Sequence, residues 1–327
     1  MADNPRRHHF LPIFYLRNFC SAKGQLYVYE RGKLPRTSVP KQEAHIRDLY
    51  TFEDEGGKKF EIEKALSKYE GDAAPVIQGI LDRTENRSHR HLTDSETDIL
   101  RYLVALMFVR VPAGRKLDEQ YIEPAVRKLL EGAAHDSRQF AELLKDVPED
   151  ENLSVEERAL LIEDVRLGIL NGYYNEPPAP GFRLQAMLHV AGMIAIELQG
   201  YSCLIVLAPK HEPFITGDTP VCTATEIDGK TQLGTAFADK NTAIWLPIST
   251  KVCLLWRRRE EPGFGKLPSR GVRIVKRTTM RFAERFVYSN EYSLKLAETF
   301  TRTPQMVLPG KNAFIPMWDG KPILDPE

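Results

Sequence analysis

Two adjacent histidines near the N-terminus have the chemistry that binding or catalysis would need. An imidazole beside carboxylates acts as a nitrogen ligand of a metal or as a general base. His8 and His9 are neighbours in an extended segment, so at most one of them is expected to face the interior. Neither belongs to a His-x-x-x-His or His-Glu-x-x-His motif. The pair therefore needs partners from elsewhere in the chain.

Glu63 and Glu70 are the first candidate partners. They are seven residues apart, and the apolar residues around them repeat at helical spacing, which predicts a helix from about Phe60 past Ile77. Both carboxylates then lie along one edge of the apolar stripe. Two aligned carboxylates can hold a divalent metal, share a proton or clamp an arginine. Ordinary surface charge of a helix is the simpler interpretation, and both stay open.

Arg110 is the most informative single residue. It ends an apolar helix predicted for residues 94–111, and at 100° per residue it shares a narrow arc with Leu103 and Leu106. An unpaired buried guanidinium costs several kcal/mol, so we expect Arg110 to be buried and paired with Glu63 or Glu70. A structural ion pair and a contact to a ligand are the two interpretations.

Asp218 follows a predicted strand and a glycine and precedes Thr219-Pro220. An acid at a strand end is a frequent place for a catalytic or metal-binding carboxylate. Aspartate also caps turns by accepting hydrogen bonds from the backbone, and the sequence favours neither role. The later Asp228-Gly229 pair is typical of a hairpin turn.

The segment HHFLPIFYLRNF, from His8 to Phe19, combines these histidines with a proline, Arg17 and several large apolar side chains. Proline suits the first turn of a short helix. We therefore expect Tyr15, Leu16 and Phe19 to be buried beside the helix of Glu63. Arg17, like Arg110, is a candidate for binding phosphate oxygens.

The elements that must position these residues follow from periodicity and end signals. Capping boxes at Thr93–Glu96 and Ser154–Glu157 begin two helices. Further helices are expected at 118–133, 136–146, 183–199, 278–285 and 293–300. Strands are expected at 25–30, 48–52, 202–207, 213–216, 242–247, 251–257 and 272–275.

This order predicts an α+β fold with a small N-terminal β element, a helical middle and a mixed, β-rich C-terminal part. Residues 1–327 are interpreted as one large domain, with lobes of residues 1–200 and 201–327.

Composition excludes some classes of protein. Forty-five basic residues balance forty-five acidic ones, so any nucleic-acid face must be local. The stretch from Lys251 to Phe286 is basic and contains aromatic residues, which suits either a phosphate backbone or a solvated face. The four scattered cysteines predict reduced thiols, and no apolar run is long enough to cross a bilayer. We expect a cytoplasmic protein without membrane contact.

The remaining histidines are solitary in sequence. We interpret them as surface residues: His45, His89, His91, His135, His189 and His211.

The His8–Phe19 segment, Arg110-Val111-Pro112 and the sequence FITGDTPV from Phe214 to Val221 together resemble the bacterial domain-of-unknown-function family 4238. Members of that family begin with a similar His-x-x-Pro-x-x-x-Leu-Arg-x-Phe segment. The likeness extends over most of the chain, although Thr278-Thr279 stands where such families often carry an asparagine. The resemblance implies no activity.

Two functional hypotheses follow. In the first, His8 or His9, Glu63, Glu70, Asp218, Arg17 and Arg110 form a polar site for ligand binding or for structure. In the second, the histidine and the acids surround a divalent metal or a water, the arginines bind phosphate, and the protein hydrolyses phosphodiesters as a nuclease does. The cofactor and the partner stay unknown, with a divalent metal, a phosphate-containing ligand or nucleic acid as candidates.

Overall fold

The computed structural model describes residues 7–47, 49, 52–54, 57–59, 61–88, 91–117, 123–143, 154–173, 180–227, 230–258, 260–306, 317–318 and 321–322. The chain divides into two compact units. The larger unit comprises Met1–Arg115 and Arg183–Pro309, and the smaller one Lys116–Phe182 and Gly310–Glu327. The fold is α+β, as predicted. The interpretation of residues 1–327 as one large domain stays a prediction.

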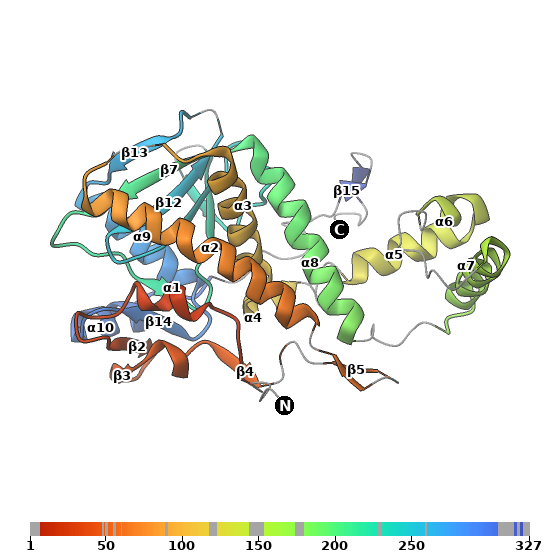
Figure 1. The fold of residues 1–327 in the computed structure, drawn as a ribbon, viewed down its shortest axis with the longest axis horizontal. Coiled ribbons are helices and arrows are strands. Elements are labelled where there is room, and N and C mark those ends of the chain that lie inside the picture. Colours follow the sequence, from red (N-terminus) through yellow and green to blue (C-terminus); the bar gives the residue numbers. More distant parts are fainter. Residues whose placement is uncertain are drawn as a thin grey trace. The chain divides into compact units, whose positions relative to one another are not determined.

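A six-stranded sheet forms the centre of the larger unit (Figure 1). Its strands in spatial order are β10 (Lys230–Leu233), β9 (Cys222–Ile227), β11 (Ala243–Pro247), β12 (Val252–Arg257), β7 (Ser202–Leu207) and β13 (Gly263–Lys266). All neighbours are antiparallel except β13, which pairs with β7 in parallel. β9 and β10 pair directly on either side of Asp228-Gly229, as the predicted hairpin requires.

Helices cover both faces of this sheet, and the central strands β11, β12 and β7 are accordingly apolar on both sides. On one face, Trp256 and its neighbours pack with apolar residues of α2 (Glu61–Glu85), α3 (Asp94–Val109) and α8 (Pro180–Glu197). On the other face, Trp245 packs with Val272 and Val275 of α9 (Ser269–Phe282). Figure 1 shows α2, α3 and α8 grouped beside the strands.

A four-stranded sheet pairs segments that are far apart in the sequence. Its order is β3 (Arg36–Ser38), β2 (Leu26–Glu30), β14 (Phe286–Ser289) and β8 (Thr216–Gly217). α1 (Ile13–Arg17) contributes Tyr15 and Leu16 to the same core as Val28 and Tyr288 of this sheet. On the opposite face, Tyr29 packs with α10 (Leu294–Arg302). The predicted burial of Tyr15, Leu16 and Phe19 is confirmed, because each is 0% exposed.

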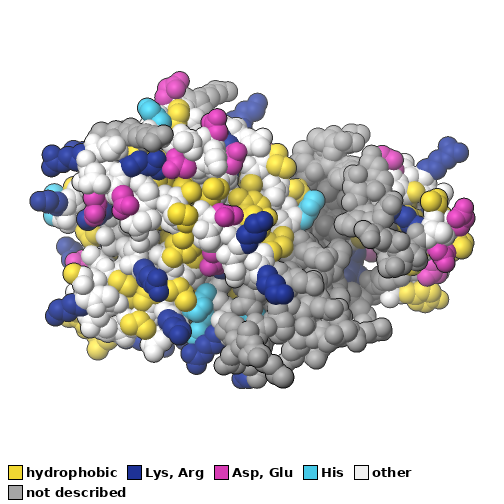
Figure 2. Space-filling view, in the orientation of Figure 1, with side chains coloured by type: hydrophobic (Ala, Val, Ile, Leu, Met, Phe, Trp, Pro, Cys, Tyr) yellow, Lys and Arg dark blue, Asp and Glu magenta, His cyan; other side chains and the backbone are white. Residues whose placement is uncertain are grey.

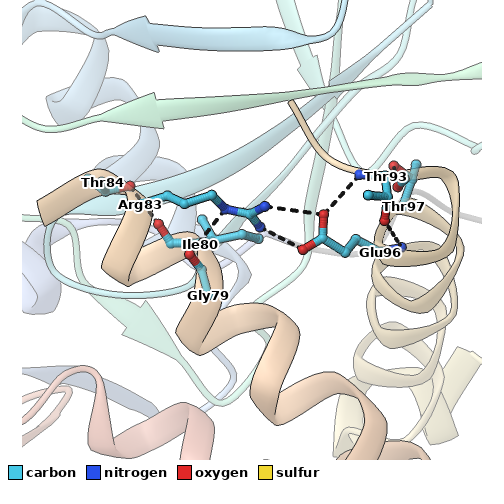
Figure 3. Close-up of polar contacts among 7 residues, drawn as sticks. All are labelled: Gly79, Ile80, Arg83, Thr84, Thr93, Glu96 and Thr97. Atoms are coloured by element: carbon cyan, nitrogen blue, oxygen red, sulfur yellow. Dashed lines mark hydrogen bonds and ion pairs between the residues drawn. The ribbon is translucent and has the colours of Figure 1, made fainter. Parts of the chain in front are cut away.

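Among the described residues, two ion pairs connect α2 to α3, and the first lies at the start of α3 (Figure 3). Glu96 accepts from the backbone N–H of Thr93, and the Thr93 hydroxyl accepts from the N–H of Glu96. This is the predicted capping box. The same carboxylate pairs with Arg83 of α2, at 2.8 Å between Nη2 and Oε1. One glutamate therefore both begins α3 and fixes it to α2.

The smaller unit contains α5 (Glu123–Ala134), α6 (Ser137–Leu143) and α7 (Val155–Leu170), which contact one another. The predicted capping box of Ser154 and Glu157 begins α7. Arg166 of α7 donates to the carbonyl of Ala134 at 2.6 Å, which fixes α7 to the end of α5. A short pairing of β15 (Met317–Trp318) with β16 (Lys321–Pro322) completes the described part of this unit.

Some predicted elements were wrong. Residues 272–275 form no strand but belong to α9, where Val272, Val275, Thr279 and Phe282 make a buried stripe at helical spacing. Residues 283–285, expected in a helix, instead lead into β14. The strand expected at 213–216 contributes only Thr216. Most of the strand expected at 48–52 lies outside the described residues, and β5 (Phe52–Asp54), which pairs with β6 (Gly57–Lys59), begins at its end.

α2 continues through Pro75 as a single helix, and α4 (Pro112–Leu117) follows α3. All four cysteines are free, as expected. In the part of the chain that the structure describes, we find no helix with the length and apolar character needed to cross a membrane.

The hydroxyl of Tyr15 connects the two sheets and gives a test of the fold. It donates to the carbonyl of Pro247 at the end of β11 and accepts from the hydroxyl of Thr216 in β8, both at 2.7 Å. Tyr15→Phe leaves both partners buried without it, so we expect a loss of about 1–3 kcal/mol in the free energy of unfolding. Urea unfolding measures it. The control is Tyr27→Phe, whose half-buried hydroxyl donates to Gln25 at 3.3 Å and should cost less. Equal losses would contradict the bridging role.

Candidate functional site at the N-terminal ribbon

The two histidines lie on a short antiparallel ribbon formed by β1 (Arg7–His9) and β4 (His45–Arg47), called here the N-terminal ribbon. His9 stands opposite His45, and His8 opposite Ile46. Because side chains alternate along a strand, His8 and His9 point to opposite faces. His8 is buried at 2% exposure, whereas His9 is half-buried. The expectation that only one of them faces the interior is confirmed.

The guanidinium of Arg110 fixes this ribbon to the helices. Arg110 is the C-terminal cap of α3 and is 1% exposed. Its Nη1 lies 2.8 Å from Oε1 of Glu70 in α2, and its Nη2 donates to the carbonyl of His9 at 2.5 Å. The predicted burial of Arg110 and its pairing with Glu70 are both confirmed. The pair is the second connection between α2 and α3, at the opposite end from Arg83 and Glu96.

A hydrogen bond to the backbone selects one tautomer of the His9 imidazole. Its Nε2 lies 3.2 Å from the carbonyl oxygen of Lys41, and a carbonyl only accepts, so Nε2 carries the hydrogen. In the neutral ring the lone pair is therefore on Nδ1. The His45 ring lies 5.6 Å away between centroids. A neutral imidazole with a defined lone pair can act as a base or as a hydrogen-bond acceptor.

Burial lowers the pKa of His9 below its ordinary value of 6.5. The hydrogen bond to Lys41 and the negative charge of Glu70 act in the opposite direction. His45 and the positive charge of Arg110 add to the lowering. Because the pKa is lowered, the neutral form of His9 predominates at pH 7.

Cations surround the imidazoles on the exposed face of the ribbon. Arg7 and Arg47 are directly opposite each other and both are exposed, as is Lys41 in η1 (Pro40–Gln42). By alternation, the two arginines share one face with His9 and His45. Figure 2 shows histidine side chains beside lysine and arginine side chains on the lower part of the molecular face drawn. Each of the four ribbon side chains on this face, Arg7, His9, His45 and Arg47, carries nitrogen.

Two other predicted site residues are not seen at this cluster. Arg17 is exposed in the last turn of α1. Glu63 belongs to α2, two turns before Glu70, but its side chain lies outside the described residues. The structure therefore brings together His9, Glu70 and Arg110 from the predicted set.

Asp218 occupies a different place, at the four-stranded sheet. It is 4% exposed, and its carboxylate accepts from the backbone N–H groups of Glu284, Arg285 and Phe286, each at 2.8 Å. Burial raises its pKa to about 6, against the opposite effect of these hydrogen bonds. Such contacts are those of a turn cap, here for the connection between α9 and β14. A catalytic role for Asp218 stays a prediction.

His45 is the residue of this site that sequence reasoning missed. It was expected on the surface, but it is half-buried opposite His9. Its place depends on the pairing of β1 with β4, and no local pattern around residue 45 indicates that register. The exposure expected for His91, His135, His189 and His211 is confirmed, and His89 lies outside the described residues.

The described side chains do not form a metal site. Within the described ranges, no three or more His, Cys, Asp or Glu side chains converge on a point where they could hold a metal ion. Glu63 was one of the predicted ligands, and its side chain lies outside the described residues. The divalent metal stays a prediction.

Comparison with known proteins places the chain in a family. Residues 7–293 match the model of a family described as proteins of unknown function, DUF4238. The match covers most of the chain, so the protein belongs to this family. No curated protein and no solved structure matches the chain.

The lowered pKa of His9 predicts a dependence of stability on pH. Below about pH 6.5 the unfolded chain binds a proton at His9 more readily than the folded protein does, so the free energy of unfolding falls as the pH decreases. Above that pH the contribution is fully present. His9→Gln should remove this part of the dependence. Urea unfolding at pH 7.5 and 5.5 measures it, with His211→Gln, an exposed histidine, as the control. An unchanged dependence in His9→Gln would contradict the account.

Proposed function

We propose that the protein binds a phosphate-bearing ligand on the exposed face of the N-terminal ribbon. The observation that carries this proposal is the register of β1 and β4. It places Arg7 opposite Arg47 and His9 opposite His45 on a single face. Four nitrogen-bearing side chains then approach one ligand from two strands.

Electrostatics favours an anion at this place. Arg7 and Arg47 place two positive charges at directly opposite positions of the paired strands. A phosphate bound between them would form a charge-assisted interaction with each arginine. Arginine is well suited to the role, because its planar group matches the geometry of phosphate oxygens. In neutral His9 the remaining ring nitrogen, Nδ1, only accepts, so it suits a hydroxyl group or a protonated phosphate oxygen of the ligand.

Arg110 supports the ribbon but does not reach the ligand. At 1% exposure its guanidinium is used by Glu70 and by the carbonyl of His9. It acts as a positioning residue, which keeps β1 at a fixed distance from α2 and α3. Preorganisation of this kind lowers the conformational cost of binding.

Hydrolysis of a phosphodiester is a second candidate function, favoured by one observation. Because Nε2 of His9 donates to Lys41, Nδ1 carries the lone pair that a general base needs. Glu70, 28% exposed, lies near enough to influence the pKa of this ring. A divalent metal held by His9, Glu70 and further acids such as Glu63 would supply the activated water.

A charge-matched pair of double variants tests the binding proposal. We expect Arg7→Gln/Arg47→Gln to weaken binding of a fluorescent single-stranded oligonucleotide at least about tenfold at low salt, by removing two phosphate contacts. The slope of log affinity against log salt should become smaller by about 1.4. Fluorescence anisotropy measures both. Lys295→Gln/Arg302→Gln, which removes two exposed cations from α10, is the control.

The two double variants separate site binding from general charge attraction. Equal weakening by both would show that only net charge matters and would contradict the proposal. Inorganic pyrophosphate, titrated in competition, distinguishes a preference for small phosphates from one for nucleic acid. Cleavage of the oligonucleotide with Mn²⁺ that is lost in His9→Gln and Glu70→Gln, with cooperative unfolding retained, would favour the hydrolase instead.

A further inference from the structure

A cavity of about 170 Å³ lies in the larger unit, at the N-terminal end of α3. Its walls come from the first two turns of α3, the start of β7 and the edge strand β13. None of the residues of the N-terminal ribbon lines it. The volume is similar to that of an engineered protein cavity of ~150 Å³ that holds benzene. It can therefore contain a small organic molecule.

One face of α3 gives this cavity both signs of charge. Asp94, Thr97 and Arg101 all line it. They are three and seven residues apart, so they lie in a row along the helix. The acid is at the start of the row, a hydroxyl is in the middle and the guanidinium is at the end. Figure 3 shows Thr97 at this end of α3, where its hydroxyl donates to the carbonyl of Thr93 at 2.9 Å.

The guanidinium of Arg101 is held in place by two contacts, one to a backbone carbonyl and one to Asp98. Its Nε donates to the carbonyl of Leu198 at 3.2 Å, and its Nη1 pairs with Asp98 at 2.6 Å. Asp98 lies one turn closer to the start of α3, and long helical side chains point in that direction. The guanidinium thus lies beside Asp98, which is one helical turn after Asp94 in α3. Nη2 is the part of the group that these two interactions leave for a ligand.

The opposite wall is apolar and aromatic. Ile205 of β7 and Phe264 of β13 line the cavity there. β7 and β13 pair with Ile205 opposite Phe264, so these two side chains lie on the same face of the sheet. A ligand thus meets a carboxylate and a guanidinium on one side and hydrocarbon on the other.

We propose that this cavity binds a free amino acid with an apolar side chain. The ligand carboxylate pairs with Arg101, its ammonium group pairs with Asp94, and its side chain packs on Ile205 and Phe264. A ligand with only a carboxylate would desolvate Asp94 without pairing it, and a ligand with only an ammonium group would gain nothing from Nη2 of Arg101, whose charge is otherwise paired with Asp98. The site therefore discriminates for zwitterions, and it is independent of the ribbon on which phosphate binding is proposed.

Isothermal titration calorimetry on the full chain tests this with three molecules of similar shape. Leucine carries both charges, isoamylamine lacks the carboxylate, and 4-methylpentanoate lacks the ammonium group. We expect leucine to bind, and each singly charged compound to bind at least about tenfold more weakly. Equal affinities for the three, or absence of leucine binding up to about 10 mM, would overturn the proposal.

Two variants locate the binding. Thr97→Phe fills the cavity from α3 and should abolish leucine binding. Its control is Thr299→Phe in α10, an exposed threonine whose hydroxyl donates to the carbonyl four residues earlier, as that of Thr97 does. Asp94→Asn should weaken leucine but not 4-methylpentanoate, whereas Asp72→Asn, an exposed acid of α2, should change neither. Unchanged leucine binding in Thr97→Phe, with cooperative unfolding retained, would show that the cavity is not the site.

Discussion

The buried guanidinium of Arg110 is the interaction on which the rest of the larger unit depends. A charge at 1% exposure is unfavourable by several kcal/mol unless it is paired and hydrogen-bonded, and Arg110 meets both conditions with Glu70 of α2 and the carbonyl of His9 in β1. Arg83 and Glu96 hold the same two helices at their other ends. The antiparallel helices α2 and α3 are thus held together by two ion pairs. β1 is held at one of these pairs, through the hydrogen bond from Arg110 to the carbonyl of His9.

This arrangement determines what the N-terminal ribbon presents to solvent. Since the carbonyl of His9 is used by Arg110, the backbone of β1 is fixed where its side chains meet those of β4. The imidazole of His9 is then held at Lys41 and faces His45. Rigid support beneath a polar, cationic face is what a preorganised anion site requires. The proposed function rests on this link between the buried ion pair of Arg110 and Glu70 and the exposed side chains that the pairing of β1 with β4 brings together.

The features that could be predicted from sequence are those with a local cause. The burial of Arg110 followed from its place on an apolar helical arc, and the start of α3 from its capping box. The place of His45 depends on strand pairing between distant segments, which no local pattern contains. Residues 272–275 were mistaken for a strand because a run of four residues is too short to distinguish the two periods.

A double-mutant cycle on Arg110→Met and Glu70→Gln tests the central claim most directly. Urea unfolding of the two single variants, the double variant and the unmodified protein gives the coupling free energy between the two side chains. If the ion pair holds the helices as described, each single variant leaves a partner uncompensated, so the double variant should be more stable than the sum of the single losses implies, by about 1–3 kcal/mol. Additive losses would contradict the account.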